Sequence, residues 1–202
     1  MKISDVLHNC PGNNFHYHTL TAEERRAQQT SVTNYAYCSY PGLNDGNGKI
    51  CNRTEIINAE IRNVVNRNGR NFGPAHTTYM NNCLQPMGGD ERGHLIAATL
   101  GGTNQLYNLI PQHRAVNANR GVAGDPQNYW FNNERAVNNF LRAGRDNRID
   151  LEVRLQYAGP NDRRPDRINV RVRAFRGNER VRTWNGVQWD EYFQIPNRGR
   201  RA

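Results

Sequence analysis

Strict alternation of apolar and polar residues in the last quarter of the chain constrains its fold more than any other feature. The alternation runs through LEVRLQY (151–157), INVRVRAF (168–175) and ERVRTW (179–184). Side chains on a strand point alternately to the two faces of a sheet, so this pattern predicts antiparallel strands that pack one face on a core. The other face is basic, and rows of Arg repel one another unless an anion or a carboxylate lies nearby. Its arginines include Arg154, Arg171 and Arg173.

Two helices are expected in the first 70 residues. Thr21 followed by Glu24 matches a capping box, which predicts a short helix through about residue 29. Apolar residues recur at helical spacing in residues 54–66, and the following Asn68-Gly69 is a typical helix end. These apolar residues are Ile57, Ile61, Val64 and Val65.

Segments without such patterns are expected to be irregular. The chain is predicted to be loop-rich to about residue 50, with an exposed turn at GLNDGNGK. Residues 71–89 are also predicted to lack regular structure because Pro and Gly punctuate them.

A further helix is expected from Asp125-Pro126 to just before Gly144. Asp is a favourable N-cap, Pro is tolerated at the first helical position, and Gly commonly follows a helix. Glu134 falls on the apolar stripe, where a carboxylate is costly unless it is paired or metal-linked. Both a structural salt bridge and a functional role fit that position. The stripe comprises Trp130, Val137 and Leu141, with Phe140 beside it.

All four cysteines lie within the first 83 residues, at Cys10, Cys38, Cys51 and Cys83. There is no CxxC pair, and no His recurs near them at zinc-finger spacing. Two disulfides are therefore favoured, with three possible pairings. Cys38–Cys51 is the preferred one, because it would close a short Gly/Asn-rich loop. The 202 residues suit a single domain, with a disulfide-stapled N-terminal part over about residues 1–70.

The charge of the chain indicates a polyanionic partner. Its 27 Lys and Arg outnumber 18 Asp and Glu, for a formal net charge of +9. Only Lys2 and Lys49 are lysines, and Arg suits bidentate contact with phosphate. A merely soluble basic protein is the alternative. No apolar run is long enough for a membrane helix, and the first residues lack a signal-peptide core. A secreted mature protein is therefore expected, with an otherwise exported or an intracellular one as alternatives.

The side chains that can carry chemistry are concentrated between residues 88 and 117. His94 precedes the apolar run LIAA, a context typical of a packed histidine, but the preceding Gly93 permits close backbone approach. An imidazole that titrates near neutrality is the usual group for activating a water. Asn104, Asn108 and Asn117 follow. Asn is ordinarily a turn or capping residue, although its amide oxygen can bind a hard cation.

Residues 88–134 resemble the core of the DNA/RNA non-specific endonucleases, a family of the ββα-metal or His-Me finger group. Its signature is Asp-Arg-Gly-His, Asn-Leu-x-Pro-Gln, an Asn five residues later and a Glu on the next helix. The first position here is Glu91 instead of Asp, although Asp90 precedes it, and Asn138 stands where some relatives carry Arg. The clear match covers about a quarter of the chain. It comprises Glu91-Arg92-Gly93-His94, Asn108-Leu109-Ile110-Pro111-Gln112, Asn117 and Glu134.

The resemblance implies an α+β fold, in which a mixed, largely antiparallel sheet carries a ββα-metal active site with flanking helices. It implies His94, on or just after a strand, as the general base. Asn117 would hold Mg²⁺, or Mn²⁺ or another divalent cation, and Glu134 would accept hydrogen bonds from metal-bound waters, both from helices. Asn108 would complete the catalytic set by orienting the loop, together with Asn104. The phosphate would be bound by Arg92, Arg120 and Arg135.

The implied activity is metal-dependent hydrolysis of phosphodiester bonds in DNA and RNA, without sugar specificity, to 5′-phosphate and 3′-hydroxyl ends. Two alternatives remain open: a catalytically inactive nucleic-acid-binding protein and a secreted interaction domain on the same scaffold. An exported toxin with a cognate inhibitor or immunity protein is an alternative to a scavenging role.

Overall fold

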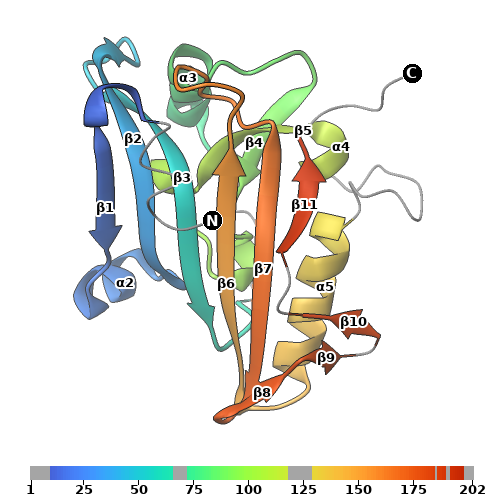
Figure 1. Cartoon of the computed structure of the whole chain (residues 1–202). Helices are drawn as coiled ribbons and strands as arrows, with labels where there is room; N and C mark the ends of the chain where they lie inside the picture. Colours follow the sequence, from blue (N-terminus) through green and yellow to red (C-terminus); the bar gives the residue numbers. More distant parts are fainter. Residues whose placement is uncertain (1–9, 66–71, 118–128, 185, 190–191, 198–202) are drawn as a thin grey trace, which may run out of the picture.

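The computed structural model describes residues 10–65, 72–117, 129–184, 186–189 and 192–197 (Figure 1). Its main sheet comprises β1 (Phe15–Thr19), β2 (Val32–Asn44), β3 (Ile50–Ile61), β6 (Asn147–Gln156), β7 (Arg167–Arg176), β8 (Glu179–Val181) and β11 (Tyr192–Pro196). The order is β1-β2-β3-β6-β7-β11, β8 also pairs with β7, and every pairing is antiparallel.

Two short strand pairs and several helices accompany this sheet. The pairs are β4 (Asp90–His94) with β5 (Leu109–His113), and β9 (Thr183–Trp184) with β10 (Val187–Gln188). The α-helices are α2 (Ala22–Gln28), α3 (Pro74–Cys83), α4 (Arg114–Asn117) and α5 (Tyr129–Arg142). The 3₁₀ turns are η1 (Pro11–Asn13), η2 (Ala98–Leu100) and η3 (Leu106–Asn108). No described helix is long and apolar enough to cross a membrane. This α+β fold, built on an antiparallel sheet, confirms the predicted class.

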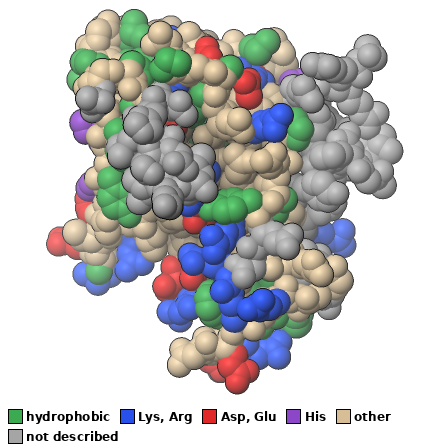
Figure 2. Space-filling model, in the orientation of Figure 1, with side chains coloured by type: hydrophobic (Ala, Val, Ile, Leu, Met, Phe, Trp, Pro, Cys, Tyr) green, Lys and Arg blue, Asp and Glu red, His purple; other side chains and the backbone are tan. Residues whose placement is uncertain are grey.

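The alternating C-terminal segments form β6, β7 and β8 as predicted. Their apolar residues are buried except the half-buried Phe175 and Val181, and between β6 and β7 Arg171 lies opposite Glu152 and Arg173 opposite Asp150. Figure 2 shows basic and acidic side chains interspersed over the lower half of this view. Strand β6 therefore supplies the carboxylates that a row of arginines requires.

Helix α5 and the segment after β4 pack against the sheet to form the largest core. Val137 and Leu141 are buried there as the predicted stripe requires, together with Phe140. The helix ends at Arg142, just before Gly144. The side chain of Trp130 and the predicted start at Asp125-Pro126 lie outside the described residues.

The predicted helix over residues 54–66 was wrong, because most of this stretch belongs to β3. Ile57 and Ile61 are four residues apart, an even spacing that places them on one face of a strand as well as of a helix. Ala59 lies between them on the same face, and all three are buried. Residues 53–57 in the middle of β3 are all buried, so both faces of the strand are covered there, and such strands need not alternate. Strands β1 to β3 also replace the expected loop-rich N-terminal part.

Of the two short helices α2 and α3, local sequence patterns predicted only the first. Helix α2 begins with the predicted capping box, in which Thr21 Oγ1 accepts from Glu24 N at 3.1 Å and Glu24 accepts from Thr21 N at 2.8 Å. Helix α3, by contrast, occupies residues that were expected to be irregular. It starts at Pro74, a favoured first position, but its polar sequence has no clear apolar stripe.

Both expected disulfides form, as Cys10–Cys38 and Cys51–Cys83. The preferred pairing Cys38–Cys51 was wrong. Both residues lie on neighbouring strands, but Cys38 pairs in register with Arg53 and is offset from Cys51 by two residues. Cys38 instead joins β2 to Cys10, just before η1, and Cys51 joins β3 to Cys83, at the end of α3.

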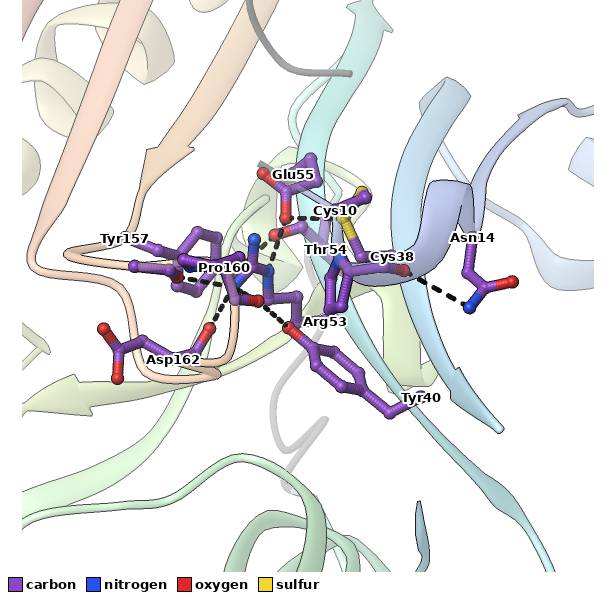
Figure 3. The surroundings of a disulfide bond; sticks show 12 residues. Cys10, Asn14, Cys38, Tyr40, Arg53, Thr54, Glu55, Tyr157, Pro160 and Asp162 are labelled. Carbon is purple, nitrogen blue, oxygen red and sulfur yellow. Dashed lines mark hydrogen bonds and ion pairs between the residues drawn. A yellow bond between two sulfur atoms is a disulfide. The ribbon is translucent and has the colours of Figure 1, made fainter. Parts of the chain in front are cut away.

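A buried ion pair lies beside the Cys10–Cys38 disulfide (Figure 3). Arg53 is fully buried, and its Nε donates to Glu55 Oε1 at 2.6 Å. Its Nη1 donates to the carbonyl of Pro160 at 2.9 Å, and its guanidinium lies 4.1 Å over the ring of Tyr157. Burial raises the pKa of Glu55 to about 7, against the lowering effect of Arg53. A carboxylate oxygen of Glu55 lies within 4.8 Å of both sulfurs, but disulfide sulfurs are not thiolates and make no metal site.

Candidate active site

The β4–β5 hairpin presents the central motif. Antiparallel pairing sets Gly93 opposite Ile110 and His94 opposite Leu109, so His94 is the last residue of β4, as expected. A Cβ on Gly93 would lie 2.2 Å from Gln112 Oε1, inside contact distance. The motif glycine is therefore needed to leave room for the buried Gln112 side chain.

The His94 ring is held by an aromatic contact and a hydrogen bond. It stacks on Phe72 with 4.1 Å between ring centroids and 20° between planes. Its Nε2 lies 3.1 Å from Oδ1 of Asn104. Because an amide oxygen only accepts, this contact favours the tautomer with the proton on Nε2 and the lone pair on Nδ1.

His76 on α3 adds a further contact that was not predicted. The N–H of Gly73 donates to Nδ1 of His76 at 3.2 Å, so Nε2 carries the proton and donates to the backbone carbonyl of Asn104 at 2.6 Å. Phe72 lies between the two histidines, with its centroid 5.0 Å from that of His76. These contacts join residues distant in sequence, and no local pattern predicts them.

Arg92 and Asp90 are engaged in holding the surrounding loops. Nη1 of Arg92 donates to the carbonyls of Phe72 and Gly73. Asp90 is buried and accepts a bidentate pair from Arg164, through Nε at 2.6 Å and Nη2 at 2.8 Å. Both carboxylate oxygens of Asp90 are therefore bound to Arg164. Its neighbour Glu91 is the acidic residue that occupies the first position of the motif.

Glu91 lies against Asn117, the expected metal ligand. Asn117 is exposed at the end of α4, and its Nδ2 donates to Glu91 Oε2 at 3.0 Å. This contact fixes the amide, with Oδ1 directed away from Glu91. Amide and carboxylate oxygens are the donors that Mg²⁺ and similar hard cations prefer, so this pair fits a divalent ion.

Asn108 is completely buried and its amide binds only main-chain atoms. Oδ1 accepts from Ile96 N at 2.7 Å, and Nδ2 donates to the carbonyls of Ile96 at 3.0 Å and Thr103 at 2.9 Å. Its oxygen and both amide hydrogens are engaged in these three bonds, so Asn108 has no group left for a substrate. Asn108 therefore ties together the two ends of the segment between β4 and β5.

Glu134 lies on α5, as expected, beside the residue that follows His94. With Leu95, Ala97 and Val137 it lines a small cavity of about 10 Å³. This is roughly the room that one water requires. The other residues of this lining are mainly apolar, so Glu134 lies at the border of the core and is half-buried. Arg135 is exposed on the same helix, and Arg120 lies outside the described residues.

Comparison with known proteins identifies the family of the chain. The sequence profile of a family described as DNA/RNA non-specific endonuclease matches residues 44–175, from the end of β2 to β7. The chain belongs to the DNA/RNA non-specific endonuclease family. The match extends well beyond the motif block and includes β3, β6 and nearly all of β7. Membership in this family gives the chain the scaffold of a non-specific endonuclease.

Individual proteins are similar to the chain in part of the sequence or in fold. The type VII secretion system protein EssD of Staphylococcus aureus, strains USA300 and NCTC 8325, is 31% identical over 81 residues. That match covers 40% of this chain but only 12% of EssD. A structure described as an extracellular endonuclease has a TM-score of 0.52 at 16% identity, covering 93% of this chain and 91% of its own. The Sda1 nuclease with bound zinc ion scores 0.50 at 17% identity, covering 98% and 87%. At such identities, these structures establish the fold alone.

Proposed function

We propose that this nuclease uses a divalent metal ion to hydrolyse phosphodiester bonds within DNA and RNA, with little preference for sugar or sequence. The expected products carry 5′-phosphate and 3′-hydroxyl ends. The observation that carries the proposal is His94 at the end of β4, stacked on Phe72 and bonded to Asn104, in a chain of this family.

His94 is the general base in this proposal. Asn104 keeps the proton on Nε2, so Nδ1 has the lone pair that removes a proton from the attacking water. Phe72 restricts rotation of the ring, which orients Nδ1. Both groups act through His94 and are positioning residues.

Asn117 would hold the metal ion through Oδ1, and Glu91 would fix the amide for that contact. Glu134 would accept hydrogen bonds from water molecules on the ion. When bound, a divalent cation supplies Lewis-acid charge at the phosphate and the leaving oxygen. The zinc ion of the similar Sda1 nuclease supports a divalent cation, and Mg²⁺ is the proposed physiological choice, with Mn²⁺ as an alternative.

The roles of the basic and amide residues differ in the proposal. Arg135 is exposed and available to bind a phosphate, as is proposed for Arg120. Arg92 would both support the loop at Phe72 and direct its remaining N–H groups to the phosphate. Asn108 has a positioning role, because its amide is fully used by the main chain.

The test is cleavage of plasmid DNA and total RNA, with Mg²⁺ and with EDTA, by the native chain and by His94→Ala. We expect metal-dependent degradation of both substrates and a loss of at least about 100-fold in the variant, as for a general base. His18→Ala is the matched control, since His18 lies on β1 and pairs with Glu24. Binding without cleavage under every divalent metal would support the inactive binding protein instead. Absence of both would favour an interaction domain.

We also propose that the protein acts outside the cell that makes it. Its two disulfides are typical of oxidising compartments, and the secretion-system relative supports export. An inhibitor or immunity protein would then be needed if the target is a competing cell. Detection of the protein only inside producing cells would contradict this localisation.

A further inference from the structure

A groove of about 210 Å³ opens beside the candidate active site. One wall is formed by β2 and β3, and the other by α3 and the segment that leads into η3. Four of its lining residues are tyrosines, and the lining contains no carboxylate. The residues on which the inference depends are Tyr35, Tyr37, Lys49, Asn52, Tyr79 and Tyr107.

Aromatic rings form a row that begins in the groove and extends beyond it to His16 on β1. Tyr107 stacks on Tyr35 with 4.2 Å between centroids and 16° between planes. Tyr35 is followed by Tyr37 at 5.9 Å, and Tyr37 stacks on His16 at 5.0 Å. Unpaired nucleobases bind proteins by stacking on such rings.

Polar groups in the groove suit the edge of a base. The Tyr79 hydroxyl contacts both Asn52 N at 2.7 Å and Asn52 O at 3.1 Å, which fixes the backbone of that residue. Asn52 Oδ1 is buried and has no hydrogen-bond partner within the part of the chain that the structure describes. A side-chain amide offers both an acceptor and a donor to a base edge. Lys49, exposed at the groove, supplies a positive charge for the backbone.

The groove begins one residue from the group that holds His94. Asn104 contacts His94, and the next residue, Gln105, lines the groove. Helix α3 makes the same connection, because His76 contacts Asn104 while Tyr79, about one turn later, lines the groove. A nucleotide next to a phosphate at His94 therefore has the groove within reach.

We propose that this groove binds an unpaired nucleobase next to the scissile phosphate, so that single-stranded DNA or RNA is the preferred substrate. A base in a duplex is paired and stacked, and must be extruded at a cost before it can enter a protein pocket. The inference rests on the proposed nuclease function and adds a strand preference to it.

The test compares Tyr37→Leu, which removes the ring, with Tyr37→Phe, which keeps it. Binding is measured in EDTA, with a single-stranded oligonucleotide that carries the fluorescent base 2-aminopurine and with a duplex of the same sequence. We expect Tyr37→Leu to weaken single-strand binding by about 5-fold to 100-fold, the range for loss of one stacking partner, and to reduce quenching of the base. Tyr37→Phe and duplex binding should change little. Tyr17→Leu is the control. Tyr17 is exposed on β1 and pairs with Ala36, so its ring lies on the face of the sheet opposite to Tyr35 and Tyr37.

Asn52→Ala provides an independent test that does not depend on a ring. Removing a buried acceptor without a partner should leave the melting temperature unchanged or raise it, since such a group is costly. Single-strand binding should nevertheless weaken. Unchanged single-strand binding by both Tyr37→Leu and Asn52→Ala would overturn the inference, and so would equal losses of binding on single strands and duplex. Cleavage by the native enzyme would still support the nuclease function in either case. Selective single-strand binding by the native chain without any cleavage would support the groove and contradict the nuclease function.

Discussion

Asn104 connects two histidines that lie 18 residues apart in the sequence. Its side-chain oxygen faces Nε2 of His94, and its backbone carbonyl accepts from Nε2 of His76. Each contact satisfies a polar group and restricts a neighbour. The orientation of the proposed base therefore depends on a residue that would not itself touch the substrate.

Asn104→Ala should lower kcat by about tenfold to 100-fold, a typical cost of losing an orienting partner, with little change in KM. Asn104→Asp retains an acceptor and adds a negative charge, which stabilises the imidazolium form of His94. Its activity should be better preserved, with the acidic limb of the kcat profile moved to higher pH. Measuring kcat against pH for both variants checks this role. Equal losses and unchanged profiles would indicate that Asn104 serves only the fold.

The residues of the site differ in how far the sequence predicts them. His94, Asn117 and Glu134 belong to an ordered motif, and the structure places them on the predicted kinds of element. Phe72 and His76 belong to no motif, because they reach His94 and Asn104 only through tertiary packing. Such contacts have no periodicity along the chain and could not be predicted from it.

The segment between β4 and β5 is held in one conformation by close main-chain packing. A Cβ on Gly102 would lie 1.7 Å from the carbonyl oxygen of Ile96 and 2.9 Å from Nδ2 of Asn108. The first neighbour is backbone and cannot rotate away. Gly102 thus allows the two ends of the segment to close on Asn108.

Gly102→Ala should lower the free energy of unfolding by about 3 kcal/mol, at the upper end of typical overpacking costs. Chemical denaturation measures the effect. Gly88→Ala is the matched control, because a Cβ there meets nothing within 4 Å. Similar stability of the two variants would show that the segment tolerates displacement.

Among the helices and strands, the correct predictions came from sequence patterns that fit only one type of secondary structure. Alternation identified β6 and β7, and the capping box identified α2. Strand β3 was missed because spacings of four residues fit both helix and strand, and because both of its faces are buried over residues 53–57, which removes the alternation. Helix α3 was missed because its stability depends on contacts such as Cys51–Cys83, which local propensity does not contain.

For the whole molecule, the buried Arg53–Glu55 pair links stability to pH. Glu55 is 3% exposed, and its pKa rises from 4.5 to about 7 on burial. The folded form then binds the proton more tightly than the unfolded form. The free energy of unfolding therefore falls as pH rises from about 4.5 to about 7, by at most about 3 kcal/mol.

Glu55→Gln should remove this pH dependence, since Gln mimics the protonated carboxyl at every pH. Urea denaturation at pH 5, 6, 7 and 8 should show a declining stability for the native chain and a flatter profile for the variant. Glu60→Gln provides a control at a more exposed carboxylate on the same strand, which pairs with Arg62. A native profile that rises with pH between 5 and 7 would contradict the assignment.

The two disulfides follow one another along the chain without interlacing. One closes a ring between residues 10 and 38, and the next between residues 51 and 83. Each cysteine therefore pairs with a neighbour in order of appearance as the polypeptide emerges from the ribosome or a translocation pore. All four cysteines precede the β4–β5 hairpin in the chain, so both rings can close before its residues have been delivered. Vectorial oxidation, in which each new thiol joins the one that precedes it, leads directly to the native connectivity without disulfide reshuffling.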